Sequence, residues 1–354
     1  MNKQEKIKNF DPNSVGDLNN SIFGLPFNAD ESEIILVPVP WEVTVSYGGG
    51  TLEGPEAIRN ASYQVDLFDP NMNNAWMLGI WMDEVNPYLK SKSAILREKA
   101  ENYIENLTQG IDPEMDESMI KTREEILQGC KEMNAWVEER CKHFLSQGKI
   151  VGLIGGDHST PLGFTHALLS QHDSFAVLQI DAHADLRDSY EGFEFSHASI
   201  MFNVLKKQGI SKLVQVGIRD YCEEEYQRIQ ESQGRIITFF DREIKHSQYC
   251  GESWSSICDR IIHSLPEKVY ISFDIDGLDP KLCPNTGTPV AGGFEAEQVL
   301  FLIEKIVKSG KKIIGFDINE VAPGEDDFDA NVAARILYRL SNLVALSNGK
   351  KPND

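Results

Sequence analysis

The chain has 354 residues, 41% of them hydrophobic and 25% charged, which is the composition of an ordinary globular protein rather than a disordered or fibrous one. Its formal net charge of −21 excludes nucleic acid and anionic membranes as expected partners, because both would repel the chain before contact. The first ten residues lack the apolar core of a signal peptide and no later stretch is apolar enough to span a bilayer, so we expect a cytoplasmic protein.

The chain begins with a polar segment, residues 1–32, that is rich in Asn, Asp and Pro. This composition predicts an extension that wraps the surface and has little regular structure of its own. One α/β domain is predicted over residues 33–346, and the last residues, 347–354, are predicted to form a flexible tail.

Seven short runs rich in β-branched residues recur along this domain, and each is apolar nearly throughout, as in strands that are buried on both faces. Helical segments separate most of them, such as 224–233, 254–264 and 295–309, so the order β-α-β predicts a parallel sheet. Two amphipathic patterns, 94–107 and 119–145, predict longer helices that pack on the sheet. The predicted fold class is α/β, one doubly wound parallel sheet with helices on both faces. The seven runs begin at Glu33, Lys149, Ser174, Lys212, Arg235, Lys268 and Lys311.

Three of the predicted strands end in charged residues rather than in a neutral turn. The three sequences are GGDHS at Gly155–Ser159, DAHAD at Asp181–Asp185 and DIDGLDP at Asp274–Pro280. Ligands bind beyond the carboxyl ends of the strands in an open parallel sheet, so we expect the three motifs to meet in one cleft. Each motif alone is compatible with an ordinary strand cap or turn. Together they favour bound cations, because so many carboxylates in a confined site would repel one another.

The donors in these motifs are carboxylates and imidazoles, without a thiolate. The set is too large for one tetrahedral zinc ion and lacks the sulfur that structural zinc prefers. Two divalent ions that share bridging carboxylates fit better, at the separation of roughly 3.5–4 Å at which a water molecule is held and made acidic. Oxygen-rich donors with some imidazole favour Mn²⁺, with Ni²⁺, cobalt or iron as substitutes. The expected ligands are His158, Asp181, His183, Asp185, Asp274 and Asp276.

The motifs GGDHS, DAHAD and SFDIDGLDP resemble the signatures of the ureohydrolases, the family of arginase, agmatinase, guanidinobutyrase, formimidoylglutamase and guanidine hydrolase. The resemblance runs from about Glu33 to Leu346 and includes YGGGTLEGPEAIR, from Tyr47 to Arg59. It implies an arginase-like three-layer sandwich and places the chain in the agmatinase-like subgroup that includes guanidine hydrolases. A homotrimer or homohexamer is the assembly that it implies.

The resemblance also implies a role for each ligand. Asp181 and Asp274 would bridge the two ions. The first ion would also bind His158 and Asp185, and the second would also bind His183 and Asp276.

Two residues outside the metal motifs follow from the same resemblance. His197 corresponds to the histidine that shuttles a proton to the leaving amine. Glu320 corresponds to the glutamate that pairs with the guanidinium of the substrate. The implied reaction is cleavage of a guanidino C–N bond by metal-bridging hydroxide, which releases urea and needs no organic cofactor.

The sequence leaves open which small guanidino compound is the substrate. Agmatine is the first expectation, guanidine the second, and formimidoylglutamate or guanidinobutyrate come after them. Arg187 stands where arginases carry an asparagine that reads the amino-acid end of arginine, which disfavours arginase. Arg187 would either bind a substrate carboxylate or pair with Asp188 or Glu191 as part of the framework, and the second role is favoured. Phe294 is expected to add bulk to the substrate pocket.

Two further classes of protein are alternatives to the hydrolase. A metal-binding sensor of the same fold would keep the ligands without the chemistry, but His197 and Glu320 speak against it. A relative of the single-zinc deacetylases would share the general architecture. The second histidine and the complete dinuclear ligand set speak against that alternative.

Overall fold

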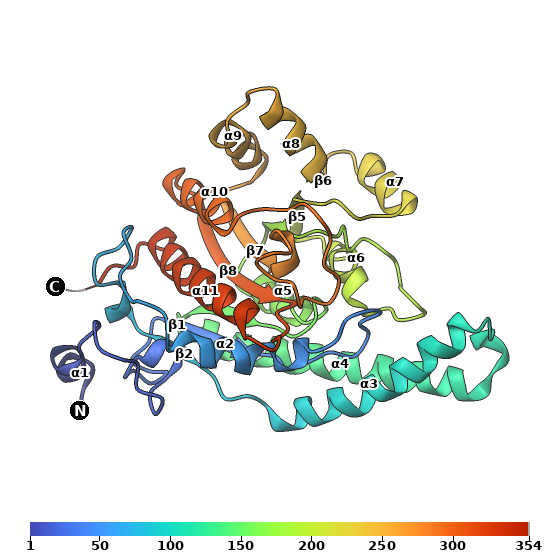
Figure 1. The fold of residues 1–354 in the computed structure, drawn as a ribbon, viewed down its shortest axis with the longest axis horizontal. Helices are drawn as coiled ribbons and strands as arrows, with labels where there is room; N and C mark the ends of the chain where they lie inside the picture. The colour runs from blue at the N-terminus through green and yellow to red at the C-terminus, as the bar shows by residue number, and fades with distance from the viewer. Residues whose placement is uncertain (353–354) are drawn as a thin grey trace.

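The structure is a computed structural model in which residues 1–352 are described. One parallel sheet of eight strands runs through the middle of the molecule, in the order β2-β1-β3-β8-β7-β4-β5-β6 (Figure 1). The predicted α/β class and the doubly wound parallel sheet are confirmed. The strands are β1 (Ile34–Pro38), β2 (Ile80–Met82), β3 (Ile150–Ile154), β4 (Phe175–Ile180), β5 (Ile210–Val216), β6 (Ile236–Phe239), β7 (Lys268–Asp274) and β8 (Lys312–Asn319).

Helices cover both faces of the sheet, so that the strands are buried from two sides (Figure 1). The burial follows the alternation of side chains along each strand. In β1, Ile34 and Leu36 belong to the core under one helical layer, whereas Ile35 and Val37 belong to the core under the other. One layer contains α2 (Gly54–Ser62), α9 (Trp254–Ser264), α10 (Ala296–Lys308) and α11 (Phe328–Ser347), and the other contains α3 (Pro87–Thr108), α4 (Glu117–Ser146), α5 (Leu162–Leu169) and α6 (Ile200–Leu205). Two further helices, α7 (Glu223–Glu231) and α8 (Asp241–Tyr249), follow β5 and β6.

The two long helices α3 and α4 pack against each other and project along one side of the molecule (Figure 1). Each begins at a capping side chain, Asn86 for α3 and Asp116 for α4, which accepts hydrogen bonds from the first free backbone N–H groups. The helices come into close contact at Gly129, where a Cβ atom would lie only 2.2 Å from Leu96 Cδ1. Val137 and Cys141 of α4 are buried toward the sheet, as the amphipathic pattern predicted.

The amino-terminal extension contains more regular structure than its composition predicted. Helix α1 (Lys3–Asn9) forms because Asn2 and Glu5 make a reciprocal capping box. An ion pair of 2.5 Å between Lys6 and Glu31 ties the two ends of the extension together. Phe10, whose ring lies 5.0 Å from that of Trp76, holds the extension to the domain.

The carboxyl-terminal segment after α11 is also in contact with the domain. Nδ2 of Asn348 donates to the carbonyl of Ile313 at 2.8 Å, and Lys350 pairs with Glu33 at 2.6 Å. The last two residues of the predicted flexible tail, 353 and 354, lie outside the described part of the chain. Within residues 1–352, no helix combines the length and the apolar character that a membrane crossing needs.

Candidate active site

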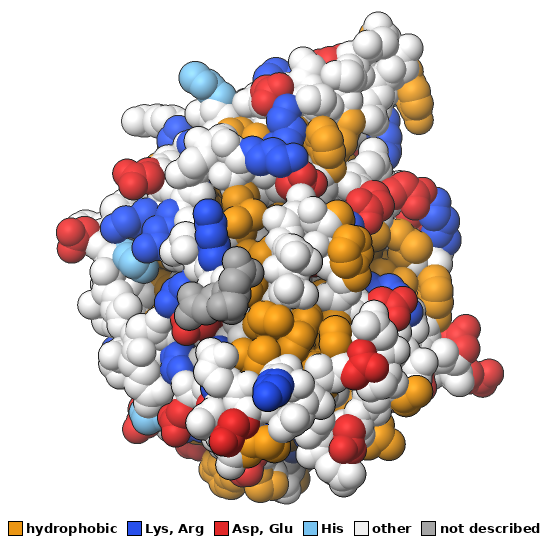
Figure 2. Space-filling model, turned by 90° about the vertical axis from the view of Figure 1, so that its left-hand side faces the viewer, with side chains coloured by type: hydrophobic (Ala, Val, Ile, Leu, Met, Phe, Trp, Pro, Cys, Tyr) orange, Lys and Arg blue, Asp and Glu red, His pale blue; other side chains and the backbone are white. Residues whose placement is uncertain are grey.

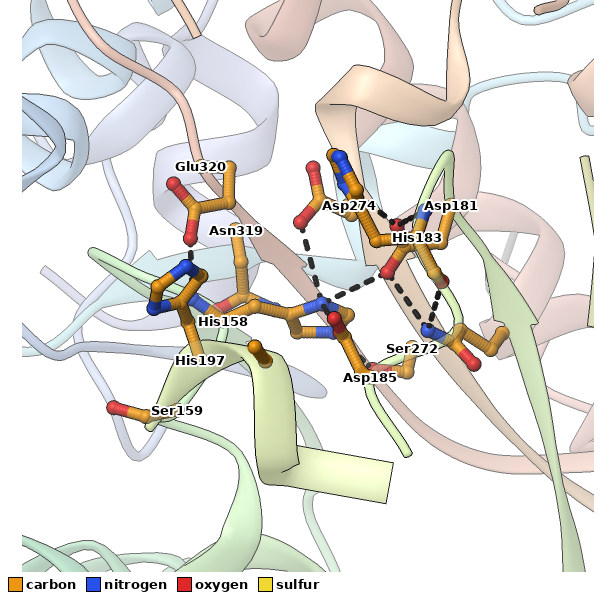
Figure 3. Close-up of polar contacts among 12 residues, drawn as sticks. His158, Ser159, Asp181, His183, Asp185, His197, Ser272, Asp274, Asn319 and Glu320 are labelled. Carbon is orange, nitrogen blue, oxygen red and sulfur yellow. Dashed lines mark hydrogen bonds and ion pairs between the residues drawn. The ribbon is translucent and has the colours of Figure 1, made fainter. Parts of the chain in front are cut away.

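The first half of the candidate site is centred on His158, which follows β3. Its Nδ1 atom lies 3.0 Å from Oδ2 of Asp181, 3.0 Å from Oδ2 of Asp185 and 3.2 Å from Oδ2 of Asp274 (Figure 3). On the far side of the ring, Nε2 is 2.9 Å from the hydroxyl of Ser272, which fixes the ring orientation. The ends of β3, β4 and β7 therefore bring these residues together, as we expected for motifs at the carboxyl ends of parallel strands.

Glycine allows β3 to end so close to its neighbours. A Cβ atom on Gly156 would lie 2.0 Å from the carbonyl oxygen of Trp41, so any larger residue would displace the turn that carries His158. Asp185 adopts a positive φ of 55°, and its main-chain carbonyl accepts N–H bonds from Met201 and Phe202 at the start of α6. The strained turn is thus held by the following helix.

The second half of the site is centred on His183. Its Nδ1 atom lies 2.9 Å from Oδ2 of Asp276 and 3.7 Å from Oδ1 of Asp181. The other oxygen of Asp276, Oδ1, accepts the backbone N–H of Ala182 at 3.0 Å. Asp181 therefore contributes to both halves, one oxygen toward each histidine.

Burial and charge repulsion shift the pKa values of the first half. Burial, followed by the charges of Asp276 and Asp181, raises the pKa of Asp274 well above its usual value. The same two causes, with Asp181 as the charged neighbour, raise the pKa of Asp185 to about 7. Burial opposes a charge on His158, but the surrounding carboxylates outweigh it and raise its pKa well above the usual value. Such a concentration of perturbed groups is typical of a functional site.

The second half behaves as a close ion pair. Burial disfavours charge on His183, but Asp276 outweighs it and raises the pKa of His183 to about 10. Burial likewise opposes charge on Asp276, and His183 overrides it, which lowers the pKa of Asp276 to about 2.

A cavity of about 150 Å³ opens beside the two halves, and His183, Asp185 and His197 line it. His197 comes from the segment between β4 and α6. Burial, followed by the positive charges of His183 and His158, lowers its pKa to about 3, so the ring is neutral at physiological pH. Its Nδ1 atom is 3.3 Å from the hydroxyl of Ser196.

Glu320 lies at the end of β8, with a positive φ of 62°. Its Oε1 atom accepts the backbone N–H of His158 at 2.8 Å, so the carboxylate is buried against the first half of the site (Figure 3). Oε2 faces Gly287, where a Cβ atom would lie 3.0 Å from it. Burial, followed by the charge of Asp274, raises the pKa of Glu320 well above its usual value.

The sequence matches the Arginase family over residues 32–341, which is most of the chain. The chain belongs to the arginase family. It is 30% identical to the N(1)-aminopropylagmatine ureohydrolase of Thermus thermophilus over 325 residues, 90% of this chain and 93% of that protein. It is 28% identical to the agmatinase of Bacillus anthracis over 312 residues, 86% of this chain and 89% of that protein. The crystal structure of the agmatine ureohydrolase of Thermoplasma volcanium has the same fold, with a TM-score of 0.70, 22% identity and coverage of 98% of this chain and 99% of that one. The predicted ureohydrolase family and the agmatinase-like subgroup are thereby confirmed.

The donor set of this arginase-family chain fits a pair of metal ions. Two groups have donor atoms that all lie within 4.8 Å of one another, and Asp181 belongs to both. Two buried atoms in these groups, Nδ1 of His158 and Oδ2 of Asp276, have no hydrogen-bond partner of suitable geometry among the described residues. Buried polar atoms without partners are rare, and divalent ions would satisfy them. The groups are His158 with Asp181 and Asp185, and Asp181 with His183 and Asp276.

Arg187 lines the cavity of this arginase-family site, with its guanidinium stacked 4.7 Å above the ring of Tyr190. Within the described part of the chain, no carboxylate lies within 4.0 Å of it, so the predicted framework ion pair with Asp188 or Glu191 is not formed. Stacking on an aromatic ring replaces the ion pair as the contact that holds the side chain.

Phe294 is placed in the core rather than in the cavity wall. Its side chain is 1% exposed, and its ring lies 5.3 Å from Trp254. It fits there because Gly217 has no side chain: a Cβ atom at that position would lie 2.7 Å from the ring. Among the described residues, those that line the cavity do not include Phe294 or Glu320.

Sequence reasoning missed six polar or aromatic residues of the cavity wall. Ser46 and Thr288 come from loops, Tyr190 from the segment between β4 and α6, Asp220 and Tyr221 from the segment after β5, and Glu225 from the first turn of α7. A signal was present for Asp220, because the strand run KLVQVGIRD also ends in charged residues. The remaining positions depend on how loops meet in three dimensions, which a single sequence does not specify.

Proposed function

We propose that the chain hydrolyses a guanidino C–N bond and releases urea, with agmatine as the substrate and putrescine as the second product. The observation that carries the proposal is the position of Asp181, shared between two groups of metal ligands beside a cavity that also contains His197. A protein that only sensed metal would not need a neutral histidine at this cavity.

In this proposal, one divalent ion would be held by His158, Asp181, Asp185 and Asp274, and the other by Asp181, His183, Asp274 and Asp276. When bound, such a pair lowers the pKa of a water molecule to near neutrality and stabilises negative charge that develops on the substrate. The oxygen-rich donor set favours Mn²⁺, with Ni²⁺ as an alternative.

Two side chains act on the substrate directly. His197 lines the cavity and would relay a proton to the departing nitrogen. Its low pKa keeps the resting ring neutral, so the ring would first accept a proton and then pass it on. Glu320 does not itself line the cavity. In this proposal its Oε2 atom would receive the N–H groups of a bound guanidinium, since Oε1 already accepts the N–H of His158. A buried carboxylate gives such a cation a charge-assisted contact that is stronger than one in bulk water.

Agmatine has a cationic tail, and one acidic side chain at the cavity is suited to it. Asp220 lines the cavity, its carboxylate lies 3.9 Å from Nε2 of His183, and its side chain is 68% exposed. An exposed carboxylate can receive an ammonium group without the penalty of burying an unpaired charge. The names of the two curated relatives support the same choice, because both act on agmatine or on a derivative of it.

Guanidine is the second candidate, and the size of the cavity favours it. About 150 Å³ is smaller than the pockets of roughly 300–1,000 Å³ that bind drug-sized ligands. The unpaired charge of Arg187 in the wall would also repel a cationic tail but would not affect a substrate that has none.

A substrate panel tests the proposal. The protein is loaded with Mn²⁺ or Ni²⁺, and urea release is measured from agmatine, guanidine, guanidinobutyrate and arginine, with formimidoylglutamate assayed by its own products. We expect agmatine to be hydrolysed with at least tenfold greater kcat/KM than guanidine. The opposite ratio would replace agmatine by guanidine. Efficient cleavage of formimidoylglutamate would assign Arg187 to a substrate carboxylate, and no turnover in the metal-loaded protein would favour the sensor.

We propose further that the protein is a homotrimer or homohexamer in which residues 1–32 contribute to a subunit contact. Val15 and Leu18 of this extension are 91% and 72% exposed. The face of the molecule on the side of α1 and the chain termini also carries hydrophobic side chains gathered between charged ones (Figure 2). Exposed apolar clusters of this kind are typical of contacts between subunits.

A further inference from the structure

Arg219, which follows β5, donates its guanidinium to the backbone of three segments. Its Nη2 atom lies 2.7 Å from the carbonyl oxygen of Asp276, 3.1 Å from that of Leu278 and 2.8 Å from that of Val290. Its Nε atom lies 3.2 Å from the same carbonyl of Val290, and Nη1 lies 3.4 Å from that of Gly217. One side chain therefore joins the end of β5, the DIDGLDP motif and the loop 284–293.

The backbone around Arg219 reaches a further segment. The N–H groups of Arg219 and Asp220 both donate to the carbonyl of Ala182, at 2.8 and 3.0 Å. Ala182 lies between Asp181 and His183, two of the residues that would hold the second ion. Through these bonds the residue is connected to the DAHAD motif as well as to DIDGLDP.

We propose that Arg219 is a positioning residue for the second ion, the one that His183 and Asp276 would hold. The inference rests on the proposed function, because it assumes a pair of ions. The carbonyl that Nη2 binds belongs to Asp276 itself, and the carboxylate of that residue reaches His183 at 2.9 Å. Fixing the backbone of Asp276 thus fixes the distance between two ligands that come from different strands.

The effect should be confined to one half of the centre. Among the described residues, the Arg219 side chain donates hydrogen bonds to the carbonyls of Asp276, Leu278, Val290 and Gly217, and to no atom of His158 or Asp185. The first ion would therefore keep its ligands if the side chain were changed. Lysine cannot replace it, because an ammonium group lacks the planar fork that serves several carbonyls at once.

Arg235 provides a matched control at the opposite end of the same strand. Its Nη2 atom donates to the carbonyls of Leu205, Lys207 and Ile210 at 2.7, 3.1 and 3.1 Å, and Nε donates to that of Ile210 at 3.3 Å. It makes the same kind of multiple carbonyl contact, but at the amino end of β5, away from the metal motifs. A loss that follows from weaker packing alone should appear in both variants.

The experiment compares full-length wild type, Arg219→Gln, Arg219→Lys and Arg235→Gln. The protein is stripped of metal and titrated with Mn²⁺, and the stoichiometry and the stepwise Kd values are measured together with the Tm. We expect both Arg219 variants to retain the first ion and to bind the second about 10–100-fold more weakly, the usual cost of losing a group that orients a ligand. Arg235→Gln should lower the Tm and leave both Kd values unchanged.

Each result decides between defined outcomes. The inference is overturned if Arg219→Gln binds both ions with wild-type affinity. If the Gln variant does not fold, the same result in Arg219→Lys overturns it. Equal weakening of both ions, or the same weakening in Arg235→Gln, also overturns it, because the role would then be structural only. A wild-type protein that binds no more than one ion contradicts the proposed function instead.

Discussion

Asp181 and His158 are in contact at 3.0 Å, from Oδ2 to Nδ1, although neither side chain has appreciable access to solvent. The other oxygen of the same carboxylate accepts the backbone N–H of His183 at 2.6 Å. A single carboxylate thus connects the two halves of the site. Its removal should affect the whole centre, whereas removal of other ligands should affect one half.

We expect Asp181→Ala to lose both ions and Asp185→Ala to lose one. Asp181 belongs to both groups of ligands, whereas Asp185 belongs to the group of His158 only. Elemental analysis after loading with Mn²⁺ measures the content, which should be about two ions per chain in the wild type. Asp188→Ala, an exposed neighbour, is the control and should keep both ions. A wild-type value of one or less would exclude the dinuclear site.

Removal of metal should destabilise the fold. The buried carboxylates of Asp274 and Asp185 repel their neighbours, as their raised pKa values indicate, and cations relieve that repulsion. Protein treated with a chelator should melt at a lower temperature, and added Mn²⁺ at about 100 times its Kd should restore roughly 2.7 kcal/mol. Differential scanning calorimetry measures the shift. An unchanged Tm, or the same shift in Asp181→Ala, would contradict this account.

His197→Ala should lower kcat by roughly 10²–10⁴, the usual contribution of a general acid or base, while the metal content stays intact. The ring lines the cavity but belongs to neither group of metal ligands. Steady-state kinetics and elemental analysis on the same sample separate the two effects. His263→Ala, an exposed histidine on α9, should behave as the wild type. Loss of metal from His197→Ala would make this residue a ligand and our assignment wrong.

Glu320→Gln should raise KM roughly ten- to hundredfold and change kcat less, because a hydrogen bond to a charged group contributes about 1.5–3 kcal/mol. Glutamine keeps an oxygen that can accept the N–H of His158, so the turn that carries this ligand should be preserved. Metal content is therefore the internal control and should remain at the wild-type value. A loss of kcat with unchanged KM would show that Glu320 does not contribute to ground-state binding.

Replacing Val15 and Leu18 by Asp should yield a smaller oligomer, since both side chains project from the extension into solvent in the isolated chain. Size-exclusion chromatography with light scattering measures the mass. Met115→Asp, at the end of the α3–α4 hairpin and 85% exposed, is the matched control and should leave the mass unchanged. An unaltered oligomer in the double variant would remove the extension from the subunit contact.

The ligand cluster could be predicted from the sequence because each of its motifs directly follows an apolar run. The run identifies a buried strand, and the parallel arrangement requires that the ends of such strands meet. Helix α9 has the predicted bounds, Trp254–Ser264, because its apolar period is clear and Ser253 caps it. β2 was not predicted, because its three residues, Ile80–Met82, are too few to give a pattern.

The cavity wall could not be predicted in the same way. Arg187 was expected to pair with a nearby carboxylate, but the structure stacks it on Tyr190, a choice that depends on the path of the loop. Phe294 was expected in the pocket, but the ring turns inward because Gly217, 77 positions earlier in the chain, leaves space for it. Contacts between distant segments decide such cases, and neither periodicity nor charge reveals them.

The strand order has a consequence for biosynthesis. β8 (Lys312–Asn319) lies between β3 and β7, although it is the last strand to be translated. β8 pairs with β3 on one side and with β7 on the other, and neighbouring strands lie about 4.8 Å apart. Until β8 is in place, the turn that carries His158 is therefore separated from the ends of β4 and β7 by the width of one missing strand. A chain that is still on the ribosome, or one cut short before residue 312, therefore lacks the framework that brings the two histidines to the same carboxylate. We therefore expect metal to be loaded only after β8 has been translated and has taken its place in the sheet.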